Sequence, residues 1–154
     1  MFTRQLAVSL SARSAIPVKE GVEGECIRPG RAYLAPGGSH MKLARGLRGE
    51  ALVRITSEPP ENNCRPAVDV LFRSAGLHFP GRSVAVILTG MGADGTLGLK
   101  ILKRGGCYSI AQDEATSVVF GMPKEAIQAG VVDEVLPLDR IAGAIVRAVG
   151  EARA

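Results

Sequence analysis

The chain has 154 residues, 46% of them hydrophobic and 22% charged, with a formal net charge of +4, which is the size of one domain with a substantial core. Its basic residues are scattered and only 4% of residues are aromatic, so a nucleic-acid-binding surface is not expected. No stretch approaches the ~20 apolar residues of a membrane span, and Cys26, Cys64 and Cys107 lack the spacing of a disulfide framework or a zinc site, so we expect a cytoplasmic protein without membrane insertion, metal or cofactor.

The first 56 residues predict one helix followed by short strands. Apolar residues recur at helical spacing over residues 2–10, which indicates an amphipathic helix. Residues 31–35 and 40–44 are strand-like and flank the turn sequence P-G-G-S, which predicts a hairpin between them. Residues 50–56 form another extended segment. We therefore expect this region to be antiparallel.

The next segment predicts a loop and then a helix. Residues 57–66 are rich in Pro and Asn, and Pro66 is suited to be the first residue of a helix. From Val68 to Ala75, apolar residues follow the i, i+3, i+4, i+7 pattern of a helix face. Asp69 falls outside this apolar face, and Gly76 is the expected stop of the helix.

From residue 84 on, strands alternate with helices. Residues 84–88 are continuously apolar, as in a parallel strand covered on both faces. Further strands are predicted at 107–111 and 131–136, and helices at 97–104 and 138–148. The alternation predicts an α/β fold with a doubly wound, mainly parallel sheet of the Rossmann-like three-layer type and an antiparallel hairpin addition.

Between the predicted strand and helix, Gly90, Gly92 and Gly95 form G-x-G-x-x-G. A dinucleotide site is one interpretation, with Asp113 about 20 residues later on the ribose, although Asp94 would occupy the pyrophosphate position. Asp94 capping its own helix is a second. A third is an ionised carboxylate at the end of a strand, suited to orient an imidazole during acyl transfer. Spacing alone leaves all three open.

Four longer blocks carry a family resemblance. YLAPGGSHM (33–41), RPAVDVLFRSAG (65–76), VILTGMGADGTLGL (86–99) and IAQDEATSVVFGMPKEAI (110–127) together resemble the catalytic domain of CheB-type protein-glutamate methylesterases of bacterial chemotaxis. The resemblance implies a catalytic domain over residues 1–154. It also implies hydrolysis of glutamate γ-methyl esters on methyl-accepting chemotaxis receptors, with release of methanol, and in many members deamidation of receptor glutamines.

The same resemblance implies roles for five residues. The aspartate of the family's Ser-His-Asp triad maps onto Asp94, and the backbone of Met91 is implicated in the oxyanion hole, with Gly92 beside it. Met122 lies in an F-G-M-P loop near the active site. His40 lies in a P-G-x-x-H-M block that we expect near the mouth of the site, in substrate contact or packing and not as a general base.

Two family blocks are not found in this sequence. The family's serine follows its first strand in a Gly-rich block, and its histidine precedes an F-T-R segment, which here is residues 2–4. We therefore expect the serine, the histidine, the first strand and the regulatory receiver domain to lie outside this chain, which would be inactive alone. Apolar faces at 84–88 and 71–72 would then be exposed. A dinucleotide-binding module and a non-catalytic receptor-binding remnant remain as alternatives.

Overall fold

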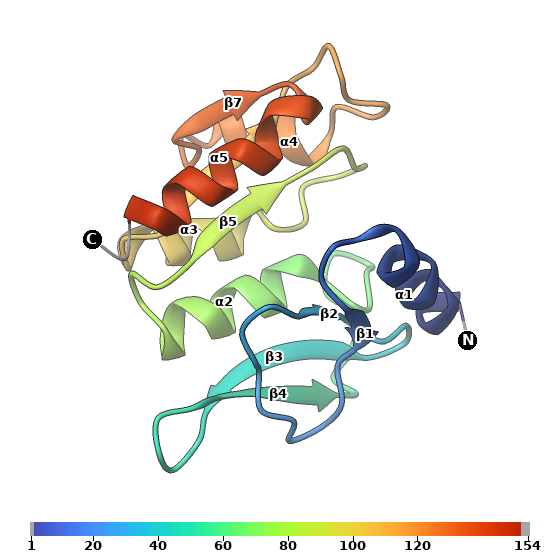
Figure 1. Ribbon diagram of the computed structural model, residues 1–154. Coiled ribbons are helices and arrows are strands. Elements are labelled where there is room, and N and C mark those ends of the chain that lie inside the picture. The colour runs from blue at the N-terminus through green and yellow to red at the C-terminus, as the bar shows by residue number, and fades with distance from the viewer. Residues whose placement is uncertain (1, 152–154) are drawn as a thin grey trace.

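The computed structural model describes residues 2–151 (Figure 1). The helices are α1 (Phe2–Arg13), α2 (Val68–His78), α3 (Thr96–Arg104), α4 (Met122–Gln128) and α5 (Leu138–Glu151). The strands are β1 (Val18–Glu20), β2 (Ala32–Leu34), β3 (His40–Arg45), β4 (Ala51–Thr56), β5 (Val84–Ile87), β6 (Tyr108–Gln112) and β7 (Glu134–Leu136). Within these residues no helix is long and apolar enough to cross a membrane.

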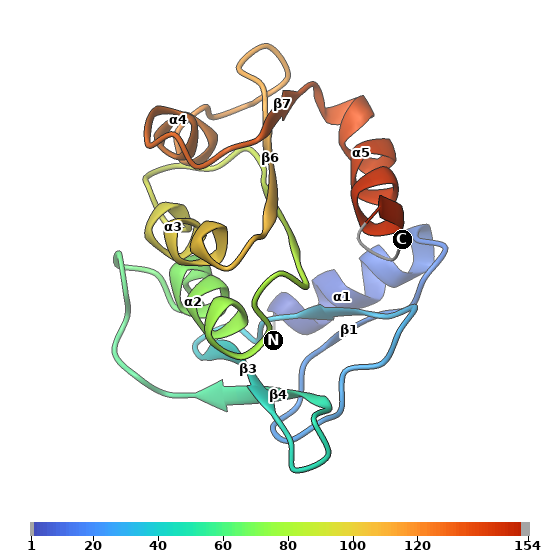
Figure 2. The ribbon, with the colours of Figure 1, turned by 90° about the vertical axis from the view of Figure 1, so that its left-hand side faces the viewer.

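A parallel sheet of order β5-β6-β7 is the middle one of three layers, with helices on both of its faces. One face packs against α2, α3 and α4 through a core that includes Ile87 and Leu99. The other face packs against α5 through Ile110 and Ile141. Figure 2 shows α3 and α4 on one side of β6 and α5 on the other. The predicted α/β class, with a mainly parallel sheet and an added antiparallel pair, is confirmed.

The antiparallel pair differs from the predicted hairpin. β3 pairs with β4, and β2 pairs in parallel with β1. The turn that reverses the chain lies at residues 46–50, where the Gly46 N–H donates to the Glu50 carbonyl at 2.8 Å and Gly49 has a φ of +82°. The P-G-G-S turn before β3 instead bonds to the distant residue Arg65, through the Gly38 N–H. The types of residue in the two turns did not show which of them joins the antiparallel strands.

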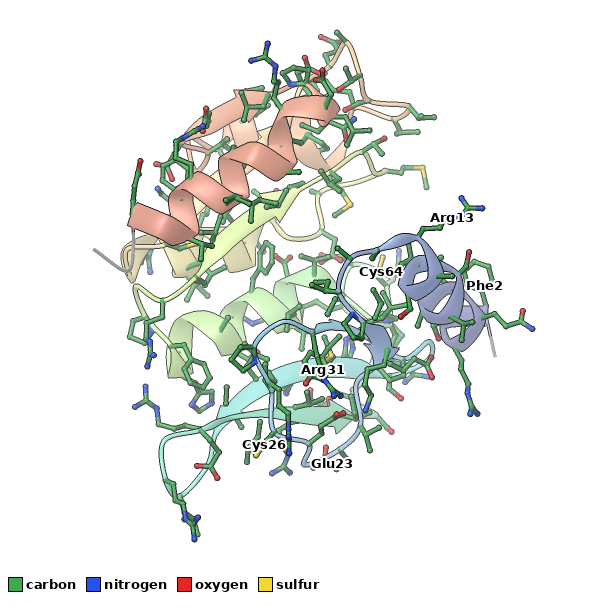
Figure 3. The ribbon with its side chains drawn as sticks, in the orientation of Figure 1. Phe2, Arg13, Glu23, Cys26, Arg31 and Cys64 are labelled. Atoms are coloured by element: carbon green, nitrogen blue, oxygen red, sulfur yellow. The ribbon has the colours of Figure 1, made fainter. Side chains whose placement is uncertain are left out.

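The predicted helix at the amino terminus is present as α1, but its buried face is different. Phe2 is 77% exposed and Leu10 is 40% exposed, whereas Ala7 is 3% exposed. Phe2 lies at the outer edge of the helix in Figure 3. The small Ala7 side chain allows α1 to lie close to β1, and the Thr3 hydroxyl bonds to Glu20 at its end. The predicted apolar stripe therefore faces solvent in this structure.

Helix α2 was predicted correctly in position but not at its ends. It begins at Val68, two residues after the expected Pro66, and continues past Gly76 to His78. Gly76 is not a stop: a Cβ built on it would lie 3.2 Å from the Ile101 side chain, so its role is to bring α2 close to α3. Asp69 falls outside the apolar pattern but is only 1% exposed, because it also faces α3.

The apolar faces expected to be exposed are mostly covered. In β5, Ala85 and Ile87 are buried and Val84 and Val86 are half-buried, while Leu88, just beyond the strand, is 43% exposed. Leu71 and Phe72 are half-buried. An apolar groove of about 250 Å³ does lie between the start of β5, α2 and the β3–β4 pair.

Candidate active site

The loop between β5 and α3 occupies the edge of the sheet where β5 ends, which is where open α/β folds place their ligands. Two of its glycines are required by backbone conformation: Gly92 has a φ of +86° and Gly95 a φ of +94°. Gly95 also makes room for the neighbouring helix, since a Cβ there would lie 3.0 Å from Val68. The glycine motif thus shapes a turn that lies against α2.

Asp94 in this loop is 6% exposed and bonds to the first turn of α2. Its Oδ2 accepts the Val68 N–H at 2.7 Å, and its Oδ1 accepts the Asp69 N–H at 3.0 Å. The Asn62 side-chain amide donates to Oδ1 at 3.2 Å. The interpretation that Asp94 caps its own helix is wrong, because α3 has no side-chain cap. Asp94 instead caps α2, whose first residue, Val68, lies 26 positions earlier in the sequence.

His40 completes the same helix end. Its Nδ1 accepts the Ala67 N–H at 3.2 Å, so its other ring nitrogen, Nε2, carries the proton and donates to the Pro59 carbonyl at 3.0 Å. The side chain is 1% exposed. It is therefore packed inside the protein with both nitrogens occupied, and the expectation that it lines the site mouth is corrected to the packing alternative.

The hydrogen bonds to Asp94 leave part of its carboxylate available. An ionised carboxylate has about four acceptor positions. Oδ1 accepts two hydrogen bonds and Oδ2 accepts one. No lysine, arginine or histidine of residues 2–151 forms a salt bridge with Asp94. The donors to this side chain are therefore uncharged, and Oδ2 can accept one more hydrogen bond.

The start of α3 is unsuited to a pyrophosphate. The Gly98 N–H, in the first turn of α3, donates to Asp69 Oδ1 at 2.6 Å. The Asn62 amide bonds to both Asp69 and Asp94, so the two carboxylates lie close together. A pyrophosphate would meet two buried carboxylates there. Asp113, the expected ribose ligand, instead accepts the Thr116 N–H and hydroxyl at 3.0 and 2.6 Å within its own turn. The geometry disfavours the dinucleotide interpretation.

A second loop, after β6, holds the glycine loop from the side. The Gly90 N–H donates to the Val119 carbonyl at 3.0 Å, and the Met122 N–H donates to the Gly90 carbonyl at 2.8 Å. A Cβ on Gly121 would lie 2.7 Å from that carbonyl, so the two loops touch through backbone. Met122, an expected site-lining residue, is half-buried and packs its sulfur against Gly90.

Met91 and Gly92 lie at the exposed tip of the glycine loop. The Met91 residue is 86% exposed, and a Cβ on Gly92 would meet nothing within 4 Å. Within residues 2–151 the N–H groups of both residues donate no hydrogen bond. Unpaired N–H groups on a fixed loop are the donors that an oxyanion hole uses.

Asn62 and Asp69 were not predicted as site residues. Asn62 donates to both Asp94 and Asp69, at 3.2 and 2.8 Å. Beside them, hydrogen bonds to Glu61 hold the pKa of Arg73 above its usual value, and the negative charges of Asp69 and Asp94 act in the same direction. The sequence feature that could have indicated the burial of Asp69 is Gly98, a glycine inside a predicted helix. A Cβ there would lie 2.6 Å from Phe72 Cβ, so α2 and α3 touch and enclose Asp69.

Comparisons with known proteins show which family the chain resembles. The family model described as CheB methylesterase matches residues 1–145. A protein-glutamate methylesterase/protein-glutamine glutaminase of Desulfotalea psychrophila is 55% identical over 97% of this chain and 41% of its own length. One of Geobacillus kaustophilus is 52% identical over 97% of this chain and 43% of its own length.

A solved structure extends the likeness to the fold. The catalytic domain of the Thermotoga maritima CheB methylesterase superposes with a TM-score of 0.93 at 41% identity, over 96% of this chain and 78% of that one. The chain thus spans about two fifths of the curated relatives it matches and most of this solved domain. Since the family model covers nearly all of the sequence, the chain belongs to the CheB methylesterase family.

Proposed function

We propose that this chain forms most of the catalytic domain of a chemotaxis protein-glutamate methylesterase. Its substrates would be γ-methyl esters of glutamate on methyl-accepting chemotaxis receptors, and glutamine side chains for a deamidase activity like that in the relatives' names. The proposal also implies a cytoplasmic protein. The observation that carries it is the buried Asp94 carboxylate, which has one free acceptor position and lies in the same loop as the Met91 and Gly92 N–H groups, which donate no hydrogen bond within residues 2–151.

In the proposed mechanism, Asp94 Oδ2 accepts the Nδ1–H of a histidine and stabilises the imidazolium that forms. The imidazole Nε2 removes the proton of a serine hydroxyl, whose oxygen attacks the ester carbonyl. The carbonyl oxygen becomes an oxyanion near the N–H groups of Met91 and Gly92. Methoxide leaves and takes the proton from the imidazolium, giving methanol. Water then hydrolyses the acyl-serine by the same steps in reverse, leaving glutamate.

The two histidines of this chain do not supply the general base. Both ring nitrogens of His40 are occupied inside the protein. His78 is the last residue of α2, whereas Asp94 contacts its first turn, so about 15 Å of helix separates them. We therefore propose that the chain needs a segment carrying the serine and histidine, and that alone it has no turnover.

The test is a hybrid enzyme. The amino-terminal segment of the Thermotoga maritima domain, which the family resemblance expects to carry the serine and histidine, is fused before Phe2, and methanol release from methylated receptor is measured. We expect turnover from the hybrid and none from the chain alone. Asp94→Asn should lower kcat by about 10⁴, because the amide favours the wrong imidazole tautomer, while Asp133→Asn should leave kcat unchanged.

Two outcomes would contradict the proposal. A folded hybrid that binds receptor tails without releasing methanol would favour the receptor-binding remnant. An Asp94→Asn hybrid with the turnover of its parent would remove Asp94 from the triad.

A further inference from the structure

A single side-chain amide joins the two buried carboxylates of the site. Asn62 Nδ2 lies 2.8 Å from Asp69 Oδ2 and 3.2 Å from Asp94 Oδ1. Asp69 is 1% exposed and Asp94 is 6% exposed. An amide NH₂ carries two hydrogens, so it can donate one to each carboxylate. Without that donor, no hydrogen would lie between the two carboxylates, and their negative charges would repel each other.

The amide also determines which oxygen of Asp94 stays available. Oδ1 accepts the Asp69 N–H and the Asn62 amide, and these two bonds fill its acceptor positions. From the described residues, Oδ2 accepts only the Val68 N–H. We propose that Asn62 is a positioning residue, whose amide bridge between Asp94 and Asp69 fixes the carboxylate so that only Oδ2 can accept the imidazole N–H. This inference rests on the function proposed above.

The backbone presents Asn62 rigidly. Its φ is +53°, a region that asparagine enters more readily than most residues. The turn that contains Asn62 is closed by two backbone hydrogen bonds of 3.1 and 2.8 Å between Glu61 and Cys64. The Glu61 carboxylate also accepts hydrogen bonds from Arg73. An amide held on an anchored turn loses little freedom when it bonds, which suits it to orient another group.

The neighbouring residue provides a matched control. Asn63 has a φ of +59°, so its backbone has the same conformation. Like Asn62 it is exposed, but its side chain forms no hydrogen bond within the described part of the chain. Glycine adopts positive φ without strain. Asn62→Gly and Asn63→Gly therefore change the backbone alike, and only the first removes the amide bridge.

The first measurement uses the active hybrid. We expect Asn62→Gly to lower kcat about tenfold with KM within twofold, because the carboxylate can then offer either oxygen. Asn63→Gly should change neither constant. Asn62→Asp keeps the shape but replaces the donors with a third carboxylate, and it should lower kcat about 100-fold. An Asn62→Gly hybrid with unchanged kcat would overturn the proposal.

The second measurement needs no turnover. In the chain itself, the NMR resonances of the Val68 and Asp69 amides report the Asp94 carboxylate that accepts them. Asn62→Gly should shift or broaden both, and most strongly Asp69, which shares Oδ1 with the amide; Asn63→Gly should move neither. Unchanged resonances, or an Asn62→Gly chain that fails to fold when Asn63→Gly folds, would overturn the proposal. A wild-type hybrid without turnover contradicts the proposed function, and the NMR comparison then decides whether Asn62 fixes the carboxylate.

Discussion

Asp94 and Asp133 are two carboxylates that tie distant segments together in different ways. Asp94 is almost fully buried and is held by uncharged donors from α2 and from Asn62. The Asp133 side chain is 30% exposed and accepts Lys103 Nζ at 2.5 and 2.6 Å, together with the N–H and hydroxyl of Ser109. Burial raises the pKa of Asp133, but the bonds from Lys103 and Ser109 outweigh it and leave the pKa below its ordinary value.

The difference separates a group suited to chemistry from one suited to stability. Asp133 has a cation of its own, so its charge is already neutralised where it lies. Asp94 has no such partner within residues 2–151. The N–H groups of α2 leave its Oδ2 able to accept a hydrogen bond from a further donor. This arrangement depends on the close approach of α2 and α3, which the predictions below test from the largest effect to the smallest.

The largest effect on stability is expected where α2 and α3 touch. A Cβ on Gly98 would lie 2.6 Å from Phe72 Cβ and 2.9 Å from the Asp69 carbonyl, so Gly98→Ala must push the helices apart. We expect a loss of about 3 kcal/mol in the free energy of unfolding, measured by urea denaturation. Gly143→Ala in α5 is the control, because its Cβ would meet nothing and helix propensity should stabilise it by about 0.5–1 kcal/mol. Equal effects of the two changes would contradict the packing described here.

The junction also marks the limit of what the sequence predicts. Hydrophobic periodicity located α2, β5 and α3, because that signal is local. Spacing left three interpretations of Asp94 open, one of them a cap on its own helix, and the burial of Asp69 was not predicted, because each contact depends on a helix that is distant in sequence. The family resemblance singled out Asp94 as the triad residue, but not the asparagine that bonds to it. Gly98 in α3 and Gly76 in α2 were local signs that two helices approach closely.

A smaller loss of stability is expected from His40. His40→Leu keeps most of the volume and leaves the Ala67 N–H and the Pro59 carbonyl without partners inside the protein. We expect the free energy of unfolding to fall by about 2 kcal/mol, while kcat of the folded hybrid enzyme stays within about threefold of its parent. His78→Ala, at the opposite end of α2, should change stability by about 0.5 kcal/mol or less. A large rise in KM for His40→Leu at unchanged stability would restore His40 to the substrate surface.

The smallest effect, and the one that depends most on conditions, is expected from Asp133. Because its folded pKa lies below the ordinary value of 3.8, its contribution to stability is present above about pH 4 and is lost as the pH falls through the folded pKa. For a pair this exposed we expect Asp133→Asn to cost about 0.5 kcal/mol at pH 7 and less at pH 2, where more of the carboxylate is protonated. Since the charge is paired with the Lys103 ammonium near the surface, 1 M NaCl should narrow the difference at pH 7. Denaturation curves of both proteins at the two pH values and two salt concentrations measure this. A difference at pH 2 as large as that at pH 7 would mean that the Ser109 bonds, and not the charge on Asp133, hold β6 to the segment before β7.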